Sequence, residues 1–268
     1  MTANQALRTL IADLRALGVQ PGQHLIVHSS LREVGPLDGG AETLFKALTI
    51  VAGDHATIVV PAQTAGNSWS SPAFRAATAG LSDAQFIKYV AAMPGFDPAV
   101  TPSAGMGAFA EYVRTRPGAM RSSHPQTSFA AIGDRATEFT GRHHLDCHLG
   151  EYSPLGWLYQ TRGAVLLLGV GYETCTAMHL SEYLLPGERP RRVYRCFTME
   201  EGRRVEREFT DISLTDSDFA SVGARIDRES FVRRGRVGKA RCRLIPIRDI
   251  VDFTVAWPPF RQRRGWYD

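Results

Sequence analysis

The chain of 268 residues has few cysteines and no long hydrophobic run. No apolar run approaches the ~18 residues that a membrane-spanning helix needs. Residues 1–19 lack the charged region followed by an apolar region that marks a signal peptide. The four cysteines, Cys147, Cys175, Cys196 and Cys242, are far apart and form no CxxC pair. We therefore expect free thiols in a reducing compartment, a cytoplasmic location and no membrane partner.

Three enzyme motifs are also missing, and one charge excess is present. The sequence has no GxSxG elbow, no GxxxxGK[ST] loop and no GxGxxG fingerprint. It therefore does not indicate a serine α/β-hydrolase, a P-loop nucleotide-binding enzyme or a Rossmann dinucleotide-binding enzyme. The net charge is +4, with basic residues concentrated in segments 189–195, 231–243 and 259–266. Such segments usually form a solvated face, and a phosphate-bearing partner is the alternative. No nucleic-acid motif accompanies them, so we expect no nucleic-acid partner.

Alternating helix and strand patterns predict an α/β fold. Apolar residues at helical spacing predict a helix over 3–18, and residues 24–28 form a short apolar run typical of a buried strand. A helix over 39–53, a strand over 56–62 and the strongest strand at 163–171 follow. Because these strands are almost continuously apolar, both of their faces must be covered. We predict a layered α/β sheet with helices on both faces.

The remaining segments complete a single domain over residues 1–268. Residues 66–105 are an excursion with one helix at 82–93, followed by a helix at 107–117 and a strand at 128–133. Segments 191–200 and 201–212 alternate like an antiparallel hairpin that turns at Glu201 and Gly202. A closing strand is predicted over 240–257, and no internal repeat or low-complexity linker is present.

The clearest candidate site is segment 169–182 (GVGYETCTAMHLSE), where a buried strand runs into a glycine-rich turn and then a helix. Ligands usually bind at such strand ends in α/β sheets. His179 falls early in that helix and Glu182 lies three residues on, on the same face. A neutral imidazole in a cleft can accept a proton near pH 7. A hydrogen-bonded core histidine is the alternative interpretation.

Three further segments carry polar residues that could form sites. Strand-end residues His28, Ser29 and Ser30 could hold a phosphate or a pantetheine arm, or could belong to an ordinary loop. In segment 104–129, glycines precede a helix containing Glu111, and cationic residues follow, which suits an anion or a solvated amphipathic helix. Segment 143–151 (HHLDCHLGE) is rich in possible metal ligands, but they are nearly consecutive and match no standard zinc spacing, so we expect a polar loop and no metal.

Five ordered segments resemble the aminoglycoside 3-N-acetyltransferases of the antibiotic N-acetyltransferase superfamily, over residues 5–258. The segments are LIVHSSLREVGPLDGGAETLFKAL, RSSHPQTSFAAIG, LGEYSPLGWLY, GAVLLLGVGYETCTAMHLSE and RDIVDFTVAW. The resemblance implies acetyl transfer from acetyl-coenzyme A to the 3-amino group of the 2-deoxystreptamine ring of an aminoglycoside, without a metal. It implies a fold distinct from the GNAT acetyltransferases and an activity that confers antibiotic resistance. Segment 63–72, however, lacks the acidic residues that several aminoglycoside-modifying members carry.

The resemblance also assigns roles to residues. His179 matches the general base, Glu111 matches an acidic position that we expect to orient it, and Asp211 matches one near the acceptor. Glu182 is a second candidate partner for His179 and a candidate acceptor ligand. We expect coenzyme A to be bound by residues of three segments: His28, Ser29, Ser30, Leu31, Met106, Gly107, Arg121, Ser122, Ser123, His124 and Phe129.

The expected mechanism is direct transfer in a ternary complex, by a monomer or a homodimer. Cys175, four residues before His179, could instead carry the acyl group in a ping-pong route. Three other functions stay open: acetyl transfer to another amine in biosynthesis, non-enzymatic binding of coenzyme A or nucleic acid, and metal-dependent hydrolysis at segment 143–151.

Overall fold

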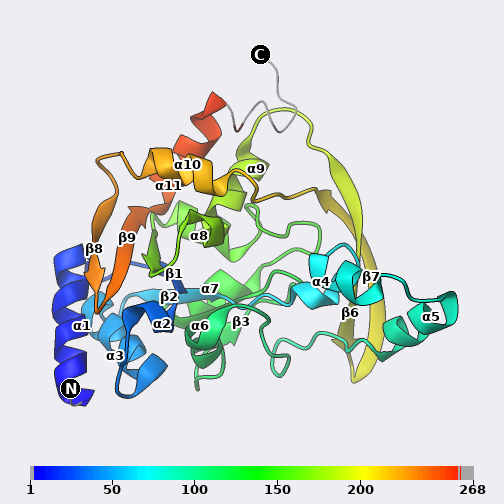
Figure 1. Cartoon of the computed structure of the whole chain (residues 1–268), viewed down its shortest axis with the longest axis horizontal. Coiled ribbons are helices and arrows are strands. Elements are labelled where there is room, and N and C mark those ends of the chain that lie inside the picture. Colours follow the sequence, from blue (N-terminus) through cyan, green and yellow to red (C-terminus); the bar gives the residue numbers. More distant parts are fainter. Residues whose placement is uncertain (1–2, 259, 261–268) are drawn as a thin grey trace.

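A computed structural model describes residues 3–258 and 260 of the chain, so most of basic segment 259–266 lies outside the described residues. Its centre is a seven-stranded mixed sheet in the order β3-β4-β2-β1-β5-β9-β8 (Figure 1). Strands β2, β1 and β5 are parallel to one another, and their neighbours β4 and β9 run antiparallel to them. The edge strands β3 and β8 are antiparallel to β4 and β9. The strands are β1 (Leu25–Ser29), β2 (Thr57–Pro61), β3 (Met120–Arg121), β4 (Phe129–Gly133), β5 (Ala164–Leu168), β8 (Arg233–Val237) and β9 (Ala240–Pro246).

The sheet separates two hydrophobic clusters, because alternate residues of each strand face opposite sides. Leu166 and Leu168 of β5 pack in one cluster, and Val165 and Leu167 pack in the other. The first cluster is covered by α1 (Ala3–Leu17), α3 (Gly40–Ala52) and α6 (Gly107–Arg114). The second is covered by α7 (Ala136–Gly141), α8 (Pro154–Gln160), α9 (Leu180–Leu184), α10 (Phe219–Ile226) and α11 (Ile247–Ala256). The predicted layered α/β fold with helices on both faces is confirmed.

A separate hairpin of β6 (Arg191–Glu200) and β7 (Arg203–Ile212) stands away from this sheet (Figure 1). The excursion, with α4 (Pro72–Thr78) and α5 (Asp83–Ala92), lies beside the hairpin. Asn67 joins the two by donating to the carbonyl oxygen of Phe197 and accepting from its backbone N–H, at 2.6 and 2.9 Å. Asn67 is thus a structural link between the excursion and the hairpin.

The end of the described chain differs from the prediction. Only residues 240–246 of the predicted closing strand are extended, and α11 begins at Ile247. The apolar residues Ile247, Ile250 and Val251 recur at helical spacing and are buried together with Thr254, which explains the helix. The patterns also missed α4, α7, α8, α10 and β8. Among the described residues, no helix has the length and apolar character needed to cross a membrane.

Candidate active site

A cavity of about 540 Å³ lies where three parallel strands end. Ser29 of β1 pairs with Leu168 of β5, and the N–H of Ser30 donates to the carbonyl oxygen of Leu168 at 2.9 Å. The carboxyl ends of adjacent parallel strands therefore form one edge, where α/β sheets usually bind ligands. Segments 27–32, 105–108 and 173–176 line much of the cavity, together with Pro61, Gln63, Ala110, Val170, His179, Asp216 and Phe219.

The beginning of α6 approaches the end of β1 closely. Gly107 has a positive φ of 85°, and a Cβ built on it would lie 3.5 Å from the carbonyl oxygen of Ser29. Glycine is the residue that adopts this backbone conformation without strain. Met106 and Gly107 thus line the cavity opposite Ser29 and Ser30. Their predicted role in binding coenzyme A stays a prediction.

His179 and Glu182 form a hydrogen-bonded pair at the cavity. His179 ends a short 3-10 helix (Thr176–His179) and precedes α9, so the two side chains occur one turn apart. Nδ1 of His179 lies 2.8 Å from Oε1 of Glu182. The side chain of Glu182 is 2% exposed and that of His179 is 16% exposed. The carboxylate is therefore buried behind the ring, and the ring lines the cavity.

This geometry sets the orientation of the imidazole. A carboxylate only accepts, so Nδ1 carries the proton and Nε2 has an available lone pair. The ring of Phe219 packs against His179 with 4.6 Å between the ring centroids. Backbone N–H of Thr215 lies 3.4 Å from both oxygens of Glu182 and holds the carboxylate from the other side. The pair can accept a proton from a ligand and stabilise the resulting imidazolium.

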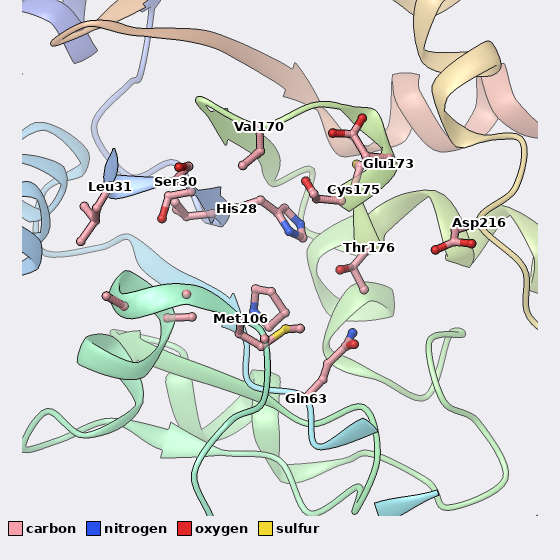
Figure 2. Close-up of a pocket in the computed structure, with 18 of the residues that line it drawn as sticks. His28, Ser30, Leu31, Gln63, Met106, Val170, Glu173, Cys175, Thr176 and Asp216 are labelled. Carbon is pink, nitrogen blue, oxygen red and sulfur yellow. The ribbon is translucent and has the colours of Figure 1, made fainter. Parts of the chain in front are cut away.

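His28 enters the same cavity from the end of β1. Figure 2 shows its ring extending between Ser30 and Leu31 on one side and Thr176 and Asp216 on the other. Burial lowers the pKa of His28 to about 4, so the ring is neutral at physiological pH. The structure gives its Nε2 no hydrogen-bond partner among the described residues.

Cys175 also lines the cavity, but its thiol is not activated. The side chain is fully buried, and burial raises the pKa of Cys175 to about 12. A thiolate is the nucleophilic form of cysteine, and at neutral pH this group is overwhelmingly a thiol. The structure therefore gives no support to the ping-pong alternative.

Glu111 does not orient His179, contrary to the prediction. Its Oε2 accepts from the backbone N–H and hydroxyl of Ser103 at 3.1 and 2.7 Å. Arg114, one turn later on α6, makes a bidentate ion pair with both carboxylate oxygens. This arrangement lowers the pKa of Glu111 to about 2, mainly through the hydrogen bond from Arg114. Glu111 fastens segment 101–106 to α6, and Glu182 is the carboxylate that bonds to His179.

Arg121, which was predicted to bind phosphate, forms hydrogen bonds with other groups of the protein instead. Its guanidinium donates to the carbonyl oxygens of Ala62 and Thr101 and to the hydroxyl of Ser128, and it stacks on Phe96. Burial lowers its pKa to about 10. These contacts tie the excursion to β2 and leave Arg121 outside the cavity lining. Ser122, Ser123, His124 and Phe129 are likewise absent from the lining, and all of these but Ser123 are buried.

Asp211 lies in a buried histidine cluster and not at the cavity. It accepts from Nδ1 of His148 at 2.7 Å, from the backbone N–H of His148 at 2.8 Å and from the Tyr183 hydroxyl at 2.6 Å. Although burial alone would raise its pKa, these hydrogen bonds lower it below the ordinary value. The acceptor-binding role predicted for Asp211 therefore has no geometric basis.

Segment 143–151, expected to be a polar loop, supplies two histidines of this cluster. Nε2 of His148 lies 2.7 Å from Oε1 of Gln126, and His143 bridges the Ser122 hydroxyl and the carbonyl oxygen of His148. His124 stacks against both rings, with centroids 4.6 and 4.7 Å away. Every ring nitrogen of His143 and His148 has a protein partner, so these rings support the fold around the hairpin.

Two carboxylates at the cavity were not predicted from the sequence. Glu173 and Asp216 both line it, and Figure 2 shows Asp216 across the cavity from Ser30 and Leu31. Asp216 directly follows Thr215, whose N–H contacts Glu182, so Asp216 is held near the base. Glu173 lies within segment 169–182 but was not singled out there, and nothing in the surrounding sequence distinguishes Asp216. Only the meeting of two distant loops reveals them.

A basic groove of about 630 Å³ opens beside the cavity and shares Ser30, Arg32, Val170 and Glu173 with it. Cationic side chains from α2 (Leu31–Val34), β8, β9 and the turn between these two strands line the groove: Arg32, Arg236, Lys239, Arg241 and Arg243. Arg243 makes a bidentate ion pair with Asp227. Arg32, Lys239 and Arg241 are exposed. Basic segment 231–243 therefore contributes a concave cationic surface, and not only a solvated face.

Comparison with known proteins identifies the family. Residues 26–258 match the sequence model of the family described as aminoglycoside 3-N-acetyltransferase. The chain is 36% identical to aminoglycoside N(3)-acetyltransferase VII of Streptomyces paromomycinus, over 93% of this chain and 90% of the relative. The aminoglycoside N(3')-acetyltransferase-like protein YokD of Bacillus subtilis is 34% identical over 93% of this chain and 91% of its own, and its crystal structure gives a TM-score of 0.86 over 94% and 92% of the two chains.

A structure described as AAC-IIIb in a binary complex with CoASH is 28% identical, with a TM-score of 0.84 over 98% of both chains. These similarities cover almost the whole length of this chain and extend over both the sheet and the cavity edge. The chain therefore belongs to the aminoglycoside 3-N-acetyltransferase family of acyltransferases.

Proposed function

We propose that the protein transfers the acetyl group of acetyl-coenzyme A to the 3-amino group of the 2-deoxystreptamine ring of an aminoglycoside, in a ternary complex and with His179 as general base. The observation that carries the proposal is the His179–Glu182 pair, 2.8 Å apart, at a cavity on the carboxyl edge of the sheet. Family relatives named for this activity and one complexed with CoASH support the choice of both substrates. Acetylation removes a positive charge from the antibiotic and weakens its hold on anionic RNA, which would give resistance.

The reaction runs as a direct displacement. The neutral amine attacks the thioester carbonyl carbon, a C–N bond forms and the carbonyl electrons move to oxygen. Nε2 of His179 takes the proton that the amine nitrogen loses, while Glu182 holds Nδ1–H and stabilises the imidazolium. The C–S bond then breaks, and the departing sulfur recovers the proton from the imidazolium. The products are the amide and free coenzyme A thiol, with no metal in the step.

Acetyl-coenzyme A enters between the end of β1 and the start of α6. Ser29, Ser30, Leu31, Met106 and Gly107 line this side of the cavity. The phosphates of the coenzyme lie in the adjoining basic groove, since Arg121 is occupied elsewhere and Arg32, Lys239 and Arg241 are exposed beside Ser30.

The phosphate assignment predicts an effect on binding and not on chemistry. Arg241→Glu should raise KM for acetyl-coenzyme A by about tenfold with little change in kcat, because a ground-state contact is lost. Arg75→Glu, on exposed α4, makes the same change in net charge far from the groove and is the control. Equal effects of the two substitutions would leave only long-range electrostatics and contradict the groove assignment.

Asp216 gives the acceptor side a carboxylate for a cationic amine. The net charge of +4 does not oppose this, because the local carboxylates decide binding within the cavity. We propose that Asp216 contacts an ammonium group of the acceptor and that the reaction takes place in the cytoplasm, within one catalytic domain. The alternative is the same transfer to another amine in biosynthesis.

The substrate is tested by following thiol release from acetyl-coenzyme A with a panel of 2-deoxystreptamine aminoglycosides and simple amines. Mass spectrometry and NMR of the product identify the acetylated nitrogen. Acetylation at the 3-amino group supports the proposal. Turnover on simple amines alone would reassign the acceptor to the biosynthetic alternative and keep the chemistry, and no release with any acceptor would overturn the activity.

A further inference from the structure

We infer that His28 is a second catalytic residue, whose Nε2–H donates a hydrogen bond to the thioester carbonyl oxygen and stabilises the negative charge that develops there. The inference rests on the proposed function, because it needs an acetyl-thioester in the cavity. It assigns His28 to the reacting atoms, where the family resemblance assigns it only to coenzyme binding.

The first observation is the unpartnered nitrogen. His28 is 5% exposed, yet its Nε2 makes no hydrogen bond with any described residue. A buried polar group without a partner destabilises a fold. The other buried histidines, His124, His143 and His148, have partners at both ring nitrogens. His28 is thus the exception among the buried histidines of the described residues.

The second observation is the position of the ring. The ring projects from the end of β1 into the cavity (Figure 2). Ser30 and Leu31 mark the coenzyme side of the ring, and Asp216 marks the acceptor side. The thioester of acetyl-coenzyme A must lie between these two sides, because the coenzyme occupies one side and the attacking amine the other. The atom that it presents to a donor is the carbonyl oxygen. Nε2 itself has almost no exposed surface, so neighbouring side chains must shift for the carbonyl oxygen to reach it. The cavity lining includes Met106, whose unbranched side chain adapts readily.

The third observation is the protonation state. Burial lowers the pKa of His28 to about 4, so the ring stays neutral and cannot be the base that gathers a proton at pH 7. A neutral imidazole remains a good N–H donor and can polarise a carbonyl group. The two histidines of the site therefore have different roles in the reaction. His179, backed by Glu182, moves the proton, and His28 transfers none and stabilises charge on oxygen.

A substitution that keeps the ring shape separates this role from others. His28→Phe should lower kcat by about 10²-fold, the usual loss for one oxyanion donor. The dissociation constant for coenzyme A, which has no acetyl group, should stay within about twofold. Because the unpartnered nitrogen is removed, the melting temperature should be unchanged or higher. His28→Gln retains an N–H donor and should recover part of kcat.

Other outcomes would overturn the inference. A kcat of His28→Phe close to wild type would show that no donor is needed there, and a parallel loss of coenzyme A affinity would place the contact on the pantetheine arm. A lower melting temperature with unchanged kcat would make His28 structural. The wild-type protein in the same assay keeps the two proposals apart. If it releases thiol normally while the His28→Phe variant does too, only the inference fails, whereas an inactive wild type overturns the proposed function and the inference together.

Discussion

Among the described residues, two histidine–carboxylate pairs have nearly equal geometry in very different surroundings. Nδ1 of His179 lies 2.8 Å from Glu182, and Nδ1 of His148 lies 2.7 Å from Asp211. The second nitrogen of His148 is occupied by Gln126 and its side chain is 4% exposed. His179 is 16% exposed and its ring lines the cavity. A carboxylate partner orients a histidine, and access to the other nitrogen determines whether the ring can take part in chemistry.

The same difference applies to the carboxylates. Glu182 is buried behind a ring that faces ligand, so its charge acts on a proton taken up during the reaction. Asp211 bonds to His148, to Tyr183 and to backbone, and its charge acts on the packing of the hairpin. Substitutions of the two carboxylates should therefore change different measured quantities, one mainly kcat and the other mainly the free energy of unfolding.

The largest effect is expected at the catalytic pair. Glu182→Gln should lower kcat by about 10²-fold or more, because a neutral amide stabilises the imidazolium poorly and does not enforce the tautomer. Steady-state thiol release measures this. Glu111→Gln is the matched control, since Glu111 bonds to Ser103 and Arg114 and should affect kcat little. A larger loss in the Glu111 variant than in the Glu182 variant would reverse the assignment.

The structural pair should respond in stability. Asp211→Asn leaves the donors of His148 and Tyr183 without a charged acceptor and should lower the free energy of unfolding by about 1–3 kcal/mol. The kcat of the folded variant should remain near wild type. Urea unfolding followed by tryptophan fluorescence, beside kinetics at low temperature, tests both statements. Unchanged stability with a raised KM for the amine would return Asp211 to the acceptor site.

A smaller effect, spread over pH, should come from the buried histidine rings. Burial lowers the pKa of His143 to about 3 and also lowers the pKa values of His124 and His148, against 6.5 for an ordinary histidine. Below pH 6.5 the unfolded chain therefore binds protons that the folded protein does not. Stability is complete above pH 6.5 and falls as the pH decreases toward about 3, by roughly 1 kcal/mol per histidine per pH unit.

Unfolding free energies between pH 4.5 and 6.5 would show this slope, since Asp211, whose pKa is already below its ordinary 3.8, stays charged there. His143→Gln should flatten the slope, and His55→Gln, at an exposed position, should leave it unchanged. Equal slopes in all three proteins would contradict a contribution from the buried histidine.

Apolar strands and local pairs were predictable from the sequence. The continuous apolar runs identified β1, β2 and β5, and the edge where β1 and β5 end located the cavity. His179 and Glu182 were predicted to share one helical face, and they do. Ser30, directly after β1, and Gly107, at the start of α6, also line the cavity. These features depend on short-range spacing, which a sequence displays directly.

Long-range arrangements were not predictable in this way. Arg121 was expected to bind phosphate, but the path of the excursion places the carbonyl oxygen of Thr101 against it. Asp211 was expected at the acceptor, but whether a hairpin residue faces inward depends on what packs under the hairpin. Asp216 joins the cavity only because its loop folds over α9. Over 240–257, both strand and helix patterns occur, and Pro246 separates them.

The most direct test of the account compares thiol release by wild type and His179→Ala at saturating acetyl-coenzyme A and aminoglycoside, with coenzyme A affinity measured by calorimetry. We expect kcat of His179→Ala to fall by at least about 10²-fold, because the base is removed. The dissociation constant for coenzyme A should stay within about twofold of wild type, because the coenzyme side is intact. A variant that keeps kcat within about threefold of wild type would contradict the assignment of His179 as the base.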